Sequence, residues 1–246
     1  MEHGSMEGRG EAGEAGVRPR RLPVGKFFYL LVSFVLLFLF YPFARTEVVG
    51  IGLIDVFTTA IFLAAIFAVS RRRRDLIAAM LVAVPGLAAN WATYLVPSVT
   101  LAIAGHAFYA AFFAITAVAV LVAVFRSGRT TFDTILGGVC VYFLLGMIWA
   151  YVFCLLELLE PGSFVAGGGK LPVQAGGPGL SDESDMVYFS FCTLTTLGYG
   201  DIIALTKPAR SLAALEAVVG QLYLAVLLAR LVALHILHGG HDRVKA

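Results

Sequence analysis

The sequence predicts an all-α membrane protein with six transmembrane helices and one shorter, re-entrant helix. Of its 246 residues, 59% are hydrophobic and only 14% are charged, a balance far more apolar than that of an ordinary soluble domain. Several stretches of at least about 18 residues carry almost no charge, and each is long enough to cross about 30 Å of hydrocarbon. The formal net charge of +2 is small, so nothing in the composition indicates nucleic-acid binding.

The elements follow one another without a long polar interruption until the last third of the chain. Residues 1–24 are rich in Gly, Glu and Arg, a composition typical of a disordered tail. Six apolar segments of spanning length then follow, at about 25–43, 52–69, 76–96, 99–125, 134–157 and 208–236. Residues 239–246 form a short tail.

A seventh apolar segment, 185–196, is too short to cross the membrane. At about 1.5 Å per residue it reaches only about 18 Å, so we expect a re-entrant or interfacial helix. The stretch between Pro161 and Asp185 that precedes it is rich in glycine. It is too polar for a span, and we expect an exposed, flexible loop.

The positive charges predict the orientation of the spans. With the N-terminus inside, thirteen Lys and Arg residues lie beside the cytoplasmic ends of the spans and four beside the outer ends. Positively charged residues gather on the cytoplasmic side of membrane proteins. We therefore expect a multi-pass protein of the plasma (inner) membrane with both termini in the cytoplasm.

The short segment ends in the sequence Thr195-Thr-Leu-Gly-Tyr-Gly-Asp201. A dehydrated monovalent cation needs a cage of oxygen ligands, which an uncharged chain supplies as backbone carbonyls and a hydroxyl. Glycines at 198 and 200 permit positive φ, so that successive carbonyls turn to one side. Thr196 adds a hydroxyl, and the preceding helix directs its partially negative C-terminus toward the same place.

This stretch resembles the selectivity filter of potassium channels, usually TVGYG, with Leu197 in place of the usual valine. The resemblance covers residues 134–238 and implies a pore domain of outer helix, turret, pore helix, filter and inner helix. It implies a homotetramer, because each chain supplies one strand of a central filter. The implied K⁺ ligands are Thr196, Leu197, Gly198, Tyr199 and Gly200, and the implied supports are Tyr188, Phe189, Cys192, Thr195 and Asp201.

The inner helix carries three further expectations. Gly220 lies at the spacing of the hinge glycine of this family, although a glycine that permits close helix packing is an equal alternative. The resemblance and the helical period together place Ala217, Gln221, Leu224 and Leu228 on the face that lines the cavity. Glu216 then points away from the ions, and we expect it to brace the pore helix or the outer helix, for example at Thr193 or Tyr188.

The first four spans, residues 25–125, resemble a voltage-sensor domain in number and position only, and 126–133 link them to the pore. The fourth span has no arginine or lysine between Val99 and Phe125, so we expect no voltage gating. Arg71, Arg72, Arg73 and Arg74 are interpreted as a topology anchor that contacts anionic lipid.

Three polar residues lie at similar depths in the first four spans: Asp55, Asn90 and His106. Buried polar groups in lipid usually find one another. We therefore expect a polar cluster, which either fixes the register of the helices or makes His106 an outward-facing proton sensor.

The sequence therefore predicts a channel that conducts K⁺ passively, with no cofactor apart from the permeant ion. A less selective cation channel and a non-conducting scaffold of the same fold are the alternatives. An enzyme is not expected, because the five histidines are scattered and no HExxH or GxSxG motif occurs. Cys140, Cys154 and Cys192 lie in apolar segments without the spacing of a zinc site.

Overall fold

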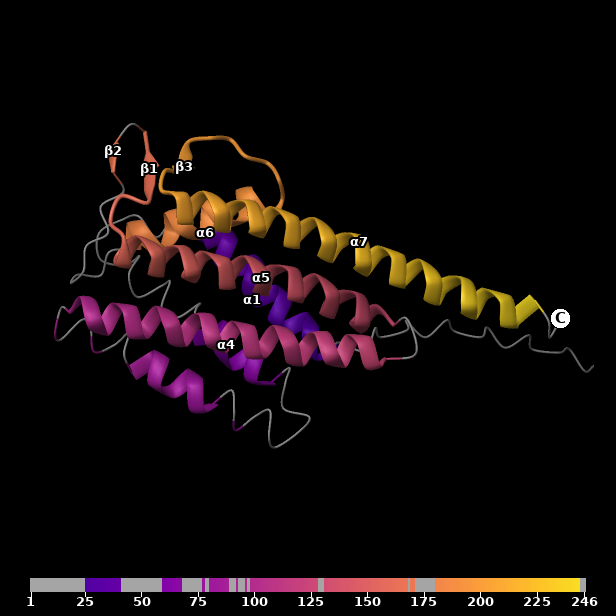
Figure 1. Cartoon of the computed structure of the whole chain (residues 1–246). Coiled ribbons are helices and arrows are strands. Elements are labelled where there is room, and N and C mark those ends of the chain that lie inside the picture. Colours follow the sequence, from indigo (N-terminus) through magenta and orange to yellow (C-terminus); the bar gives the residue numbers. More distant parts are fainter. Residues whose placement is uncertain are drawn as a thin grey trace, which may run out of the picture.

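The computed structural model describes residues 25–40, 59–67, 77, 80–88, 92, 96, 98–127, 131–167, 169–170 and 180–243. Within this part the elements are α1 (Lys26–Phe40), α4 (Val99–Arg126), α5 (Phe132–Leu159), β1 (Phe164–Ala166), β2 (Gly169–Lys170), α6 (Leu180–Leu194), β3 (Ile202–Ala204) and α7 (Lys207–Arg243). Residues 59–67 and 80–88 are also helical. Figure 1 shows α4, α5 and α7 running side by side, with α6 and the three strands gathered at one end.

Three of the described helices are long and apolar enough to cross a membrane: Val99–Arg126, Phe132–Leu159 and the Lys207–Ala233 part of α7. The apolar part of α1, Phe27–Leu39, is shorter. The protein is therefore a membrane protein built mainly from helices. The expected tail 1–24, the last three residues of the expected tail 239–246, and the Arg71 to Arg74 cluster lie outside the described residues.

Aromatic rings pack α1 against α5 and α6, and the helical segment 59–67 against α4. Phe34 of α1 stacks on Phe143 of α5 with ring centroids 5.5 Å apart, and Phe38 meets Phe191 of α6 edge to face at 4.7 Å. Phe62, from the helical segment 59–67, stacks on Phe112 of α4 at 4.0 Å. Such pairs add to the free energy gained from burial alone, so α1, the segment 59–67, α4, α5 and α6 share one apolar core.

The link between α4 and α5 is short, and it ends in a helix cap. The side chain of Thr131 accepts a hydrogen bond from the Thr134 backbone N–H at 3.2 Å, which satisfies one of the unpaired N–H groups at the start of α5. Asp133 lies in the first turn, where a negative charge is favoured. The cap thus fixes the start of α5, and α4 packs along α5.

Arg230 of α7 joins this helix to the C-terminal end of α4 through hydrogen bonds. Its Nη2 atom donates to the carbonyl oxygens of Val124 at 2.7 Å, Phe125 at 2.9 Å and Ser127 at 3.2 Å. The guanidinium also lies over the Phe125 ring, 4.3 Å from its centroid. A cation at a helix C-terminus satisfies carbonyls that lack helical partners, so α7 and α4 of one chain are joined directly.

The stretch after Pro161 differs from the exposed loop that we expected. It contributes β1 and β2 to a three-stranded antiparallel sheet of order β2-β1-β3, with Phe164 opposite Ala204 and Ala166 opposite Ile202. Phe164 is fully buried, because its ring packs on Phe153 and Phe189. The sequence did not predict this short apolar strand, because the glycines around it indicated a flexible loop.

Several boundaries also differ from the expected ones. α6 begins at Leu180 rather than 185 and ends at Leu194. It begins earlier than expected because acidic residues are favoured in the first turn of a helix. α5 begins two residues before 134, and α7 continues to Arg243, so a helix occupies part of the expected tail 239–246.

Glu157, near the end of α5, holds the start of this sheet. Its side chain is buried, with an exposed fraction of 1%. Glu157 Oε1 accepts from the Gly162 backbone N–H at 2.5 Å, and Oε2 accepts from the Phe164 N–H at 2.9 Å. One carboxylate thus pairs two backbone groups, the part-buried Gly162 N–H and the buried Phe164 N–H.

Glu157→Ala is expected to destabilise the protein. Each buried amide left without a partner costs about 1 to 3 kcal/mol, so the melting temperature of the detergent-solubilised protein should fall. Glu160→Ala is the matched control, because Glu160 lies one turn on and is exposed. Equal melting temperatures for the two variants would contradict this role of Glu157.

Candidate functional site

The stretch Thr195–Asp201 leaves the C-terminal end of α6 in a tight turn. The Cys192 carbonyl accepts from the Leu197 N–H at 2.8 Å and from the Gly198 N–H at 3.2 Å. The Thr193 carbonyl accepts from the Thr196 N–H at 2.9 Å. The last turn of the helix therefore fixes the base of the stretch, and its partially negative end lies beside that base.

Positive and negative φ alternate along this stretch. Positive values occur at Thr196 (59°), Gly198 (57°) and Gly200 (78°) and at neither residue between them. The two glycines adopt this conformation without steric cost. Thr196 does so against the preference of a β-branched residue, and its hydroxyl donates to the Thr195 carbonyl at 2.6 Å. Alternation of this kind turns successive carbonyls to one side of a strand.

The side chains of the stretch are exposed within the single chain. Leu197 has an exposed fraction of 54% and Tyr199 of 69%, and Thr195 is exposed as well. Within one chain, the ring of Tyr199 is therefore largely open.

Behind the strand, the predicted supports lie close together. Tyr188 is hydrogen-bonded to Asp201, and this bond raises the pKa of the Tyr188 hydroxyl. Phe189 is buried between Phe153 and Phe164. Cys192 is buried beside Tyr188. Asp201, which follows Gly200, is therefore bound to Tyr188 of α6, the helix that precedes Gly198.

Glu216 of α7 is fully buried and meets α6, although at a residue that we did not expect. Its partner is Ser190, rather than Thr193 or Tyr188. Ser190 Oγ lies 2.5 Å from Glu216 Oε1 and 2.8 Å from the Gly146 carbonyl of α5. This hydroxyl therefore joins α5, α6 and α7 directly behind the filter-like strand.

Gly220 lies where α7 passes the end of α6. A Cβ at this position would lie 2.6 Å from the Leu194 carbonyl oxygen, which is closer than a Cβ atom approaches a backbone oxygen. α7 continues as a helix through this point. The structure therefore gives Gly220 a packing role, and its role as a hinge stays a prediction.

The faces of α7 divide as follows. Glu216, Gly220 and Leu227 are buried, and the Tyr223 hydroxyl donates to the Gly138 carbonyl at 2.6 Å. Of the four residues predicted to line a cavity, Gln221 and Leu228 are exposed, whereas Ala217 and Leu224 are half-buried. Further apolar side chains share the exposed part of the helix, namely Leu215, Val218, Leu222 and Val226.

Two contributors to the site were missed at the level of sequence. Tyr142 of α5 donates to the Leu194 carbonyl at 3.1 Å, so this oxygen is held from one side by a hydroxyl and approached from the other by Gly220. Glu157 was missed too, although a lone carboxylate inside an apolar run, four residues before Pro161, is a usable signal.

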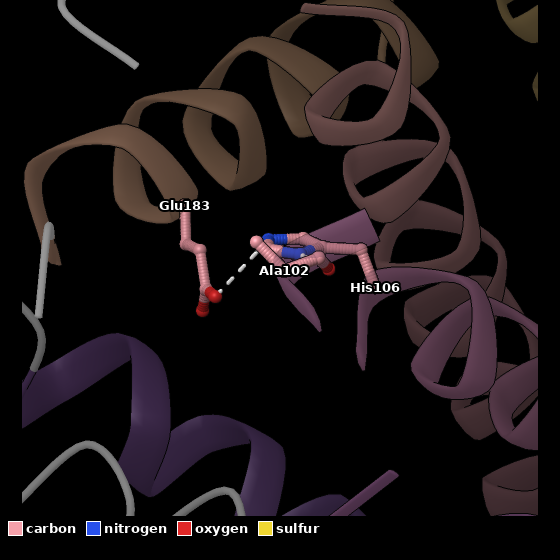
Figure 2. Close-up of polar contacts among 3 residues, drawn as sticks. All are labelled: Ala102, His106 and Glu183. Atoms are coloured by element: carbon pink, nitrogen blue, oxygen red, sulfur yellow. Dashed lines mark hydrogen bonds and ion pairs between the residues drawn. The ribbon is translucent and has the colours of Figure 1, made fainter. Parts of the chain in front are cut away.

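The expected polar cluster of Asp55, Asn90 and His106 stays a prediction, because Asp55 and Asn90 lie outside the described residues. The partner that the structure gives His106 is Glu183 in the first turns of α6, with Nε2 and Oε1 3.2 Å apart. Figure 2 shows the ring facing this carboxylate across the space between α4 and α6. Depth along a span cannot identify such a partner, because Glu183 belongs to no span.

Comparison with known protein families places this site in context. Residues 130–235 match the model of a family described as "Ion channel", a region just under half of the chain that contains α5, the sheet, α6, the filter-like strand and most of α7. No curated protein and no solved structure matches the chain. The helices that pack around the filter-like strand therefore lie in a region that is similar to an ion-channel family, within a membrane protein.

Proposed function

We propose that the protein is a potassium-selective channel in which residues Thr196 to Gly200 supply the ion ligands. The observation that carries the proposal is the alternation of φ at 196, 198 and 200. A strand of this form offers a column of carbonyl oxygens with no charged side chain, which suits a weakly hydrated monovalent cation. The buried Ser190–Glu216 pair and the Tyr188–Asp201 bond would keep the column in place.

The proposed assembly is a homotetramer around a central pore. One strand supplies ligands from one side only, so several copies are needed to surround an ion. The exposed Leu197 and Tyr199 side chains, and the exposed apolar part of α7, support this proposal. In a tetramer, Tyr199 would pack against a neighbouring copy, while Gln221 and Leu228 would line the cavity below.

The remaining features of the proposal follow from the charge pattern of the sequence. Six spans and cytoplasmic termini agree with the distribution of Lys and Arg, and passive conduction across the plasma membrane is part of the proposal. The absence of basic residues from Val99 to Phe125 argues against voltage gating. Anionic lipid is the proposed partner of Arg71 to Arg74.

Reversal potentials of the purified protein in planar bilayers test the function. With equal chloride concentrations on the two sides and most of the K⁺ on one side replaced by Na⁺, we expect the reversal potential to lie near the equilibrium potential of K⁺. A value near zero would instead identify a less selective cation channel, favoured by the departure at Leu197 from the usual filter sequence. Absence of current, together with absence of K⁺ flux from liposomes, would identify a non-conducting scaffold.

A further inference from the structure

The contact between His106 and Glu183 joins the sensor-like helices to the pore helix. His106 lies two turns into α4, and Glu183 lies in the first turns of α6. Their side chains meet at 3.2 Å, with exposed fractions of 16% for the histidine and 34% for the glutamate (Figure 2). The pair is therefore partly shielded from water and still reachable by protons.

Both ring nitrogens of His106 face hydrogen-bond acceptors. Nδ1 lies 2.6 Å from the Ala102 carbonyl oxygen, and Nε2 lies 3.2 Å from Glu183 Oε1. A carbonyl and a carboxylate only accept, whereas a neutral imidazole has a single N–H to donate. Only the protonated ring donates to both acceptors at once, and its positive charge strengthens the contact with the Glu183 carboxylate that joins α4 to α6.

The other groups that face His106 carry no charge near neutral pH. From α5 they are the Cys154 thiol and the ring of Tyr151, whose centroid lies 5.7 Å from that of the imidazole. Tyr109 of α4 lies on the far side of Tyr151. Within the part of the chain that the structure describes, Glu183 is thus the charged group in contact with His106, and it favours the protonated ring.

The pore helix connects this pair to the ion ligands. From Glu183 to Cys192, α6 spans nine residues, about 14 Å at 1.5 Å per residue. At its far end, the Cys192 carbonyl holds the backbone of Leu197 and Gly198. A short helix transmits a displacement at one end to the other, because its own hydrogen bonds keep it stiff. The position of Glu183 therefore bears on the position of the filter-like strand.

We propose that protonation of His106 fixes the pore helix through Glu183, so that external protons support K⁺ conduction. The inference rests on the proposed function and adds a regulation to it. The structure that contains the pair also contains the alternating φ pattern, so the paired state and the ordered strand occur together. Loss of the proton leaves one N–H donor for two acceptors and removes the positive charge that attracts Glu183, which weakens the contact between α4 and α6.

The test measures K⁺ efflux from liposomes at external pH values from about 5.5 to 8.5, the range in which histidine titrates, with the internal pH clamped. We expect efflux to fall about fivefold from acid to alkaline pH, the lower end of typical coupling between sites. His106→Gln and Glu183→Gln should each flatten the curve. His106→Lys should give a flat curve at the acid level, because lysine keeps its charge.

His238→Gln is the matched control, since it makes the same exchange near the end of α7. It should leave the external pH curve unchanged. A curve in His106→Gln that matches the wild-type curve, with equal protein incorporation, would overturn the proposal.

A second measurement separates failure of this inference from failure of the proposed function. The melting temperatures of the wild type, His106→Gln, Glu183→Gln and the double variant form a thermodynamic cycle. We expect coupling between the two positions at about pH 6 and none at about pH 8.5. This result would support the contact even if no variant conducted, whereas equal coupling at both pH values would overturn it.

Discussion

Gly198→Ala is expected to abolish the preference for K⁺ over Na⁺ while leaving the assembled protein intact. Gly198 has a φ of +57°, and a Cβ there would meet no atom within 4 Å of its own chain. The penalty is therefore conformational: about 1 to 2 kcal/mol for a side chain in the left-handed region, in each of four proposed copies. The strand relieves this strain by rotating a peptide group, which removes its carbonyl from the ion path. Reversal potentials in mixed K⁺ and Na⁺ measure the loss, and size-exclusion chromatography checks assembly.

Gly167→Ala is a close control for this experiment. Gly167 follows β1, has a φ of +56° and also has no neighbour within 4 Å of a built Cβ. The backbone strain is thus the same, but it lies outside the proposed ion path. We expect Gly167→Ala to keep its selectivity. If Gly198→Ala also stayed strongly selective, the assignment of ion ligands to residues 196–200 would be wrong.

Gly220→Ala is expected to lower the stability of the pore domain. Its Cβ would lie 2.6 Å from the Leu194 carbonyl oxygen, and this oxygen cannot move freely because Tyr142 donates to it. Overpacking of this kind costs about 1 to 3 kcal/mol, more than the roughly 1 kcal/mol that alanine gains over glycine inside a helix. The melting temperature of the detergent-solubilised protein should therefore fall despite the better helix former.

Gly138→Ala provides the comparison. A Cβ at Gly138 would lie 2.9 Å from the end of the Leu227 side chain, which can adopt another rotamer. We expect only a small loss of stability there. If Gly220→Ala melted like the wild type and yet conducted less K⁺, Gly220 would act as a hinge and not as a packing residue.

Residue type alone predicts much of the candidate site. Glycine at 198 and 200 permits the positive φ that both residues adopt, and the helical period directs Glu216 into the protein, where it is buried. Thr196 is different: its positive φ is imposed by the turn that the Cys192 and Thr193 carbonyls close. The conformational propensity of threonine does not predict this positive φ.

Pairings between distant segments could not be predicted from the sequence. The choice of Ser190 as the partner of Glu216, and of Glu183 as the partner of His106, depends on how α6 lies against α7 and α4. The sheet was missed for a related reason. A three-residue strand such as Phe164–Ala166 gains its stability from its partner at Ile202–Ala204, and that partner lies on the other side of the filter.

The contacts of α5 fix both ends of the filter-like strand. At its lower end, the strand follows Leu194, whose carbonyl is bound by Tyr142. At its upper end, it enters β3, which pairs with β1, and β1 is held by Glu157. Tyr142 and Glu157 stand fifteen residues apart on one helix, about 22 Å at 1.5 Å per residue. Both ends of the strand are thus bound to one continuous helix, α5. When α5 tilts in the bilayer, Tyr142 and Glu157 move together, so the spacing of the carbonyls between them is preserved.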